Sequence, residues 1–151
     1  MTMNAISQRI RLASLDSSTA VVAAVVALGD GIAILAFFGI GLFSHAVEPW
    51  VYPIHTLRTA VPFLVGWLFV SMLVGTLRFD TLSSPTRTLR YVTLGWIGAS
   101  FVGAAIRATE YFPGGAPLEF VLVNVVFGLA FVLPWRLCVS LLGRRTLRRP
   151  V

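Results

Sequence analysis

Four long apolar runs constrain the fold of this chain more than any other feature of its sequence. Each run is close to or above the roughly 18–20 residues that an α-helix needs to cross a hydrocarbon core about 30 Å thick. The runs lack the alternating pattern of barrel strands, and lipid cannot satisfy exposed backbone groups, so we expect helices. The runs are Thr19–Phe43, Leu57–Leu77, Leu89–Ile106 and Leu118–Leu142.

Composition supports this assignment. Of the 151 residues 57% are hydrophobic and only 12% are charged, about half the charged fraction of a soluble domain. Mean hydropathy is +0.86. Little sequence lies outside the runs, so we predict an all-α, single four-span transmembrane domain over residues 1–151. The first run is too long for a signal-peptide core and lacks a clear cleavage site, which favours an uncleaved span.

Basic residues lie beside the apolar runs. The net charge of +6 comes from twelve arginines and no lysine. Because these arginines flank spans and do not cover a soluble face, the pattern favours a lipid bilayer as partner and excludes nucleic acid. The single cysteine, Cys138, lies inside the last run, where we expect a small packing residue.

The loops differ in charge. The two connections that carry Glu48, Glu110 and Glu119 hold few arginines, whereas both terminal segments and the middle loop are rich in arginine. The positive-inside rule then predicts N-in/C-in topology in the cell membrane. Short connections containing proline and glycine favour antiparallel neighbours, and therefore an integral membrane up-down four-helix bundle. The arginine-rich segments contain Arg9, Arg11, Arg78, Arg87, Arg90, Arg144, Arg145, Arg148 and Arg149.

The segment before the first run contains a helix-start signal. The side chains of "DSST" (Asp16–Thr19) offer N-cap oxygens for the first span. The preceding "ISQRIRLASL" fits either an amphipathic segment on the inner leaflet or a frayed tail, and both alternatives stay open.

Polar residues inside the runs lie on or beside faces of small residues. Side chains four positions apart share one helix face, and small residues mark places where helix backbones approach closely in a bilayer. Asn124 and Gly128 give one example of this spacing. We therefore expect the unusual polar residues to face the interior of the bundle. They are Asp30, Arg58, Arg107 and Asn124.

Asp30 lies near the middle of the first run, between Gly29 and Gly31. An unpaired ionised carboxylate at that depth is too costly, so Asp30 must be either paired or protonated. The glycines allow a neighbouring helix to approach and supply a donor. Arg136 is a donor only if it turns inward, since its side chain also reaches the headgroups by snorkelling. The candidate donors at similar depth are Trp67, Thr93, Trp96 and Arg136.

Arg58, Arg107 and Asn124 lie within about two turns of the outer surface, at a rise of about 1.5 Å per residue. We predict that the two arginines approach each other there, or share a partner such as Glu110 or Asn124. Charge-assisted hydrogen bonds from such a pair would bind an anion.

Three stretches resemble motifs of a small prokaryotic membrane family catalogued as domain of unknown function 3054. They are "GD" (Gly29–Asp30), "RTAVPFLVGW" (Arg58–Trp67) and "GAAIR" (Gly103–Arg107). The resemblance covers nearly the whole chain and implies a four-span integral membrane protein without an assigned activity. It singles out Asp30, Arg58, Pro62, Trp67 and Arg107.

Two function classes fit these features equally well. In the first, the protein transports a small solute, and Asp30 exchanges protons while the outer arginines bind an anion. Because four spans leave little room for a pathway, this class implies a homo-oligomer. In the second, it is a structural or accessory membrane protein, alone or with another membrane protein. Catalysis is disfavoured because His45, His55 and Glu48 lack metal-ligand spacing and no catalytic motif occurs, so we expect no cofactor and no metal.

Overall fold

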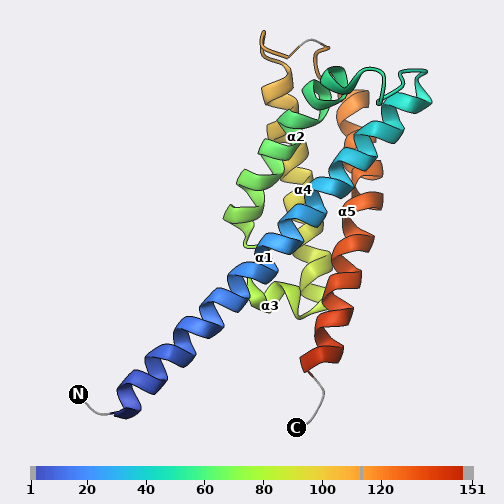
Figure 1. Cartoon of the computed structure of the whole chain (residues 1–151). Helices are drawn as coiled ribbons and strands as arrows, with labels where there is room; N and C mark the ends of the chain where they lie inside the picture. The colour runs from blue at the N-terminus through green and yellow to red at the C-terminus, as the bar shows by residue number, and fades with distance from the viewer. Residues whose placement is uncertain (1–2, 113, 148–151) are drawn as a thin grey trace.

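The computed structural model describes residues 3–112 and 114–147, and the side chains of residues 20–112 and 114–143. The described chain is helical and contains no β-strand, which confirms the all-α prediction. The described residues form four long helices and one short helix, which are drawn in Figure 1. The elements are α1 (Met3–Ser44), α2 (Pro53–Val74), α3 (Phe79–Leu82), α4 (Pro85–Arg107) and α5 (Leu118–Leu147).

Four of these helices are long and apolar enough to cross a membrane, as the apolar runs predicted. Large apolar side chains are exposed on their outer faces, among them Ile32, Leu73 and Phe101. Contiguous exposed apolar surface of this kind is unfavourable in water and suits lipid. The protein is therefore a multi-pass membrane protein. The candidate spans are Ala20–Ser44, Pro53–Val74, Pro85–Arg107 and Leu118–Gly143.

Proline and glycine set the bounds of the second and third long helices. Pro53 and Pro85 occupy the first turns of α2 and α4, so both helices start earlier than their apolar runs. Proline suits this position because its missing N–H would have no intrahelical acceptor. Gly75 ends α2 in the left-handed conformation, with φ of 77°, and its N–H donates to the carbonyl of Ser71.

The first helix differs from the prediction. α1 begins at Met3 and runs without a break through Asp16–Thr19, so the expected helix start at those residues is wrong. Good helix formers such as leucine, arginine and alanine fill the preceding segment and extend the helix. The backbone of "ISQRIRLASL" is thus helical, which rules out the frayed alternative. Its placement on the inner leaflet stays a prediction, and its side chains lie outside the described set.

Each long helix contacts two others in a closed ring, α1 with α2, α2 with α4, α4 with α5, and α5 with α1. The start of α1, the short helix α3 and the end of α5 lie at one end of the molecule (Figure 1). The connections that follow α1 and α4 lie at the opposite end, so helices adjacent in sequence run in opposite directions. The first described residues of α1 and the last of α5 therefore lie at the same end as α3, and which side of the membrane this is stays a prediction.

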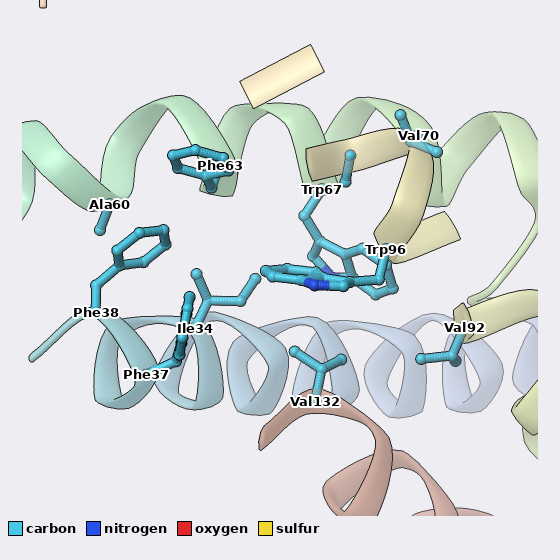
Figure 2. Close-up of a cluster of buried hydrophobic side chains, with 11 residues drawn as sticks. Ile34, Phe37, Phe38, Ala60, Phe63, Trp67, Val70, Val92, Trp96 and Val132 are labelled. Carbon is cyan, nitrogen blue, oxygen red and sulfur yellow. The ribbon is translucent and has the colours of Figure 1, made fainter. Parts of the chain in front are cut away.

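Two tryptophans occupy the middle of the buried core (Figure 2). The ring centroids of Trp67 and Trp96 are 5.8 Å apart. Phe37, Phe38 and Phe63 lie toward one end of this cluster in Figure 2. The two indole N–H groups serve two separate polar sites, described below.

Small residues bring α2 and α4 into close contact. A Cβ added to Gly66 would lie 2.7 Å from the carbonyl oxygen of Ala99, and one added to Gly103 would lie 2.5 Å from the ring of Phe63. Contacts this short leave no room for any side chain. The small-residue faces therefore mark a helix interface, as the sequence pattern indicated.

Candidate functional site

A buried ion pair joins α1 to α5. Asp30 and Arg136 are each 1% exposed. The Nε of Arg136 donates to Oδ1 of Asp30 at 2.7 Å, and Nη2 donates to Oδ2 of the same carboxylate. A bidentate arginine–carboxylate contact is among the strongest and most directional hydrogen-bonded pairs in proteins. Asp30 thus faces the interior and is paired, as the cost of burying a lone carboxylate requires.

Trp67 completes the surroundings of the carboxylate. Its Nε1 donates to Oδ2 of Asp30 at 3.0 Å, which is one of the donors that depth along the helices suggested. The same indole ring lies 5.7 Å from the guanidinium carbon of Arg136. This distance is within the range of a cation–π interaction, so Trp67 contacts both members of the pair.

The rest of the guanidinium binds the end of α2. Nη1 of Arg136 donates to the backbone oxygen of Thr76 at 2.9 Å, and Nη2 donates to the hydroxyl oxygen of Thr76 at 3.3 Å. Carbonyl groups at a helix C-terminus have no intrahelical donor, and positive charge is favourable there. Arg136 therefore links three helices, α1 through Asp30, α2 through Thr76 and α5 through its own backbone.

Threonine side chains continue this polar contact through the connection between α2 and α4. The hydroxyl of Thr81 donates to the carbonyl of Gly75 at 3.1 Å. The hydroxyl of Thr88 donates to the carbonyl of Thr81 at 2.7 Å. Both hydroxyls are buried. The connection is thus held against α4 immediately beside the Arg136 contact.

Gly29 allows the ion pair to form. A Cβ on Gly29 would lie 2.1 Å from the ring of Trp135, the residue that precedes Arg136 on α5. Only glycine permits this approach of the two helices. Gly31 has nothing within 4 Å of such a position, so only one of the two flanking glycines is required by packing. Within the described residues, the indole N–H of Trp135 has no hydrogen-bond partner.

A groove between α1 and α2 is lined in part by Asp30. Its volume is about 200 Å³, and its polar lining residues are Asp30, Trp67 and Ser71. A small solute in this groove would contact the Asp30 side of the ion pair. The lining residues are Ala27, Asp30, Gly31, Leu64, Trp67, Leu68, Ser71 and Leu77.

Asn124 belongs to a separate buried polar cluster. Its Nδ2 donates to Oγ of Ser100 at 2.8 Å, and Oγ of Ser100 donates to the carbonyl of Trp96 at 2.8 Å. Nε1 of Trp96 donates to the backbone oxygen of Asn124 at 3.1 Å. A Cβ on Gly128 would lie 2.2 Å from the Trp96 ring, so this cluster too depends on a glycine beneath an indole.

The structure does not bring Arg58 and Arg107 together. Arg58 is exposed and has no hydrogen bond or ion pair within the part of the chain whose side chains are described. Arg107 donates from Nε to the carbonyl of Gly115 at 2.9 Å and lies 5.0 Å above the ring of Phe120. Both arginines lie at helix ends, where a guanidinium keeps its water contacts or binds loop carbonyls. Among the described side chains, no hydrogen bond or ion pair joins Arg58, Arg107 and Asn124, so the outer anion site stays a prediction.

The sequence analysis gave Arg58 and Arg107 more weight as site residues than Arg136, which is the arginine that pairs with Asp30. Arg136 entered only as a conditional donor, and Thr76 was not considered. The available signal was the depth of Arg136 inside an apolar run, because intramembrane arginines pair with a partner in most cases. Cys138, which we expected to be a small packing residue, is exposed on α5. Among the described residues there is no group of three or more His, Cys, Asp or Glu side chains that would hold a metal ion.

The region of the chain that contains the ion pair matches a known protein family. A family model described as "Protein of unknown function (DUF3054)" matches residues 27–139, about three quarters of the chain. The matched region contains Asp30, Trp67, Thr76 and Arg136. No curated protein and no solved structure matches the chain. The chain therefore belongs to the DUF3054 family, whose members are proteins of unknown function.

Proposed function

We propose that this protein carries a small solute across the cell membrane, and that the Asp30–Arg136 ion pair is its central site. The observation that supports the proposal is a buried bidentate ion pair among four apolar helices, in which Asp30 is also one of the residues lining a groove. Each charge costs about 2.5–3.5 kcal/mol at the centre of a membrane helix on insertion scales. Well-packed apolar residues often hold helices as well as a buried ion pair does, so a role beyond packing explains the two charges better.

The chemistry of the pair favours an anion, a proton, or both. An anion competes with Asp30 for the guanidinium of Arg136, and a proton on Asp30 removes the charge that holds the guanidinium. Either event breaks the two-bond contact between α1 and α5. Because Arg136 also binds Thr76, the same event alters the contact of α5 with the end of α2. A proton and an anion arriving together would keep the site neutral, which is a physical basis for coupled transport.

Two copies of the chain would supply a wider pathway than one, since four helices around a filled core leave little internal space. The transport proposal therefore includes a homo-oligomer. It includes no catalysis, no cofactor and no metal.

The alternative proposal is a structural or accessory membrane protein without transport. The observation that favours it is the completeness of the network, in which all three guanidinium nitrogens of Arg136 have acceptors. Such a pair fixes the register of α1, α2 and α5. It explains both charges without any solute.

Flux measurements in liposomes separate the two proposals. Purified protein is reconstituted with an entrapped pH-sensitive dye, and an outward gradient of chloride, phosphate or acetate is imposed at constant external pH. Transport predicts dye responses above those of protein-free liposomes for at least one anion. Asp30→Asn should abolish the proton response, and circular dichroism checks that this variant, which leaves the charge of Arg136 without its counter-charge, is folded. Ser100→Ala, which changes the other polar cluster, should keep the response. Wild-type flux equal to the protein-free baseline for every anion would favour the structural role.

A further inference from the structure

A hollow of about 160 Å³ lies apart from the ion pair, at the end of the molecule opposite to α3. It is formed by α1, α2, the residues just after α1, and the start of α5. Aromatic and aliphatic side chains make up most of its wall. A purely apolar cavity of about 150 Å³ holds a benzene ring in another protein, so the volume of this hollow suits one ring. The lining residues are Phe37, Phe38, Gly41, Leu42, His45, Thr59, Phe120, Val123 and Asn124.

Asn124, one of the residues that line the hollow, has an unused hydrogen-bond acceptor. Asn124 is 1% exposed, and its Oδ1 has no hydrogen-bond partner among the described residues. The hydroxyl of Ser100 uses its proton on the carbonyl of Trp96, so it needs a donor from Asn124. This fixes Nδ2 toward Ser100 and leaves Oδ1 as the free acceptor. A buried acceptor without a partner requires an explanation, such as a bound molecule that donates to it.

A second hollow of about 280 Å³ adjoins the first one and shares Phe37, Gly41, His45 and Val123 with it. It continues between α1 and α5 toward Ile40 and Phe127, two apolar side chains that are exposed. Gly41 keeps the junction open, because nothing lies within 4 Å of the position a Cβ would take there. The two hollows together suit a ring in the inner part and an apolar tail that leads outward to lipid.

The charge of the lining residues limits the ligand classes that suit the hollow. The residues that line the inner hollow include no Asp or Glu, so an ammonium group would find no counter-charge there, and they include no Lys or Arg, so the single basic side chain for an anion would be His45 at the junction of the two hollows. A neutral donor is therefore favoured. Three phenylalanines in the wall favour an aromatic ring, because ring pairs attract in tilted and offset arrangements.

We propose that this hollow binds a lipid-soluble phenol-type molecule. Its hydroxyl group donates to Oδ1 of Asn124, its ring packs among Phe37, Phe38 and Phe120, and its apolar tail follows the groove between α1 and α5. The site is separate from the Asp30–Arg136 pair. It stands whether or not the protein transports a solute.

A matched pair of probes tests the hydrogen bond directly. Para-propylphenol carries the hydroxyl donor, and para-propylanisole has the same ring and tail but no donor. Binding of each probe is measured by equilibrium dialysis against purified protein in phosphatidylcholine nanodiscs, with empty nanodiscs as the baseline for partitioning. We expect saturable binding of the phenol and about three- to tenfold weaker binding of the anisole, the factor that one net hydrogen bond contributes.

Variants locate the site. Gly41→Leu should reduce binding of both probes, because the new side chain fills the junction of the two hollows. Gly143→Leu is the matched control, since its added Cβ also meets nothing within 4 Å but lies near the far end of α5. Asn124→Leu should bind both probes equally well. If Asn124→Leu loses its helical circular dichroism, two measurements still test the proposal. They are the comparison of phenol with anisole on the wild type, and the binding of both probes to Gly41→Leu.

Three results would overturn the proposal. The first is binding no greater than in empty nanodiscs, which means that water or nothing occupies the hollow. The second is equal affinity of wild type for the phenol and the anisole, which means that an acyl chain or any apolar group suffices. The third is unchanged binding by Gly41→Leu, which means that the probes bind elsewhere.

Discussion

Asp30 and Arg136 are 106 positions apart in the chain, and their side chains form two hydrogen bonds in the interior of the protein. The contact joins the first and last helices and closes the ring of four helix contacts. Because Arg136 also binds the carbonyl of Thr76, one guanidinium secures three helices. The pair therefore fixes the position of α5 relative to α1 and to the turn after α2.

Replacing one member of the Asp30–Arg136 pair should lower the free energy of unfolding much more than replacing both members. We expect Arg136→Met to lose about 3–5 kcal/mol of unfolding free energy, because it leaves an unpaired buried carboxylate. The double variant Asp30→Leu with Arg136→Met should recover most of this loss. Unfolding in mixed micelles, followed by circular dichroism, measures both. A single variant as stable as the wild type would show that the pair is not formed in the membrane.

The two glycines beside Asp30 should respond in opposite ways to the same substitution. Gly29→Ala places a Cβ 2.1 Å from the Trp135 ring, and separating α1 from α5 to relieve this should cost about 1–3 kcal/mol. Gly31→Ala meets nothing within 4 Å and should be neutral or stabilising by up to about 1 kcal/mol, since alanine favours helix. The same unfolding assay applies. Equal effects of the two variants would contradict the packing of Trp135 on Gly29.

Trp67→Phe should lower the free energy of unfolding by removing one hydrogen bond to Asp30, while an aromatic side chain remains in the core. Phenylalanine keeps an aromatic ring beside Trp96 but cannot donate to Asp30, and a hydrogen bond to a charged group contributes about 1.5–3 kcal/mol. Trp50→Phe is the control, because Trp50 is exposed in the connection after α1. Unfolding free energies of both variants provide the measurement. A Trp67→Phe protein no less stable than Trp50→Phe would argue against the indole–carboxylate bond.

Topology can be read from reporters at the C-terminus. The arginine distribution predicts that both termini lie in the cytoplasm. A fluorescent protein fused after Val151 should therefore fold and fluoresce, and alkaline phosphatase at the same position should be inactive. An active phosphatase fusion would reverse the orientation.

The four spans were predictable because a helix in lipid needs only length and apolar side chains, and both are properties of the local sequence. That small-residue faces such as those of Gly66 and Gly103 lie at helix interfaces was also predictable, but which helices they join was not. The burial of Asp30 followed from the cost of a lone carboxylate in lipid. Trp67 was a candidate donor to Asp30 because the two residues lie at similar depth in their spans.

The choice of Arg136 over Arg58 and Arg107 was decided by the tertiary structure. A rise of about 1.5 Å per residue fixes the depth of a side chain in a span but not the direction in which its helix turns it. That direction depends on how the helices pack, here on the Trp135 indole lying over Gly29, which turns the next residue of α5 toward Asp30. Thr76 completes the site only because α2 ends beside that guanidinium. The local sequence therefore determined where the charges lie along the membrane normal, and helix rotation in the folded protein determined which of them meet.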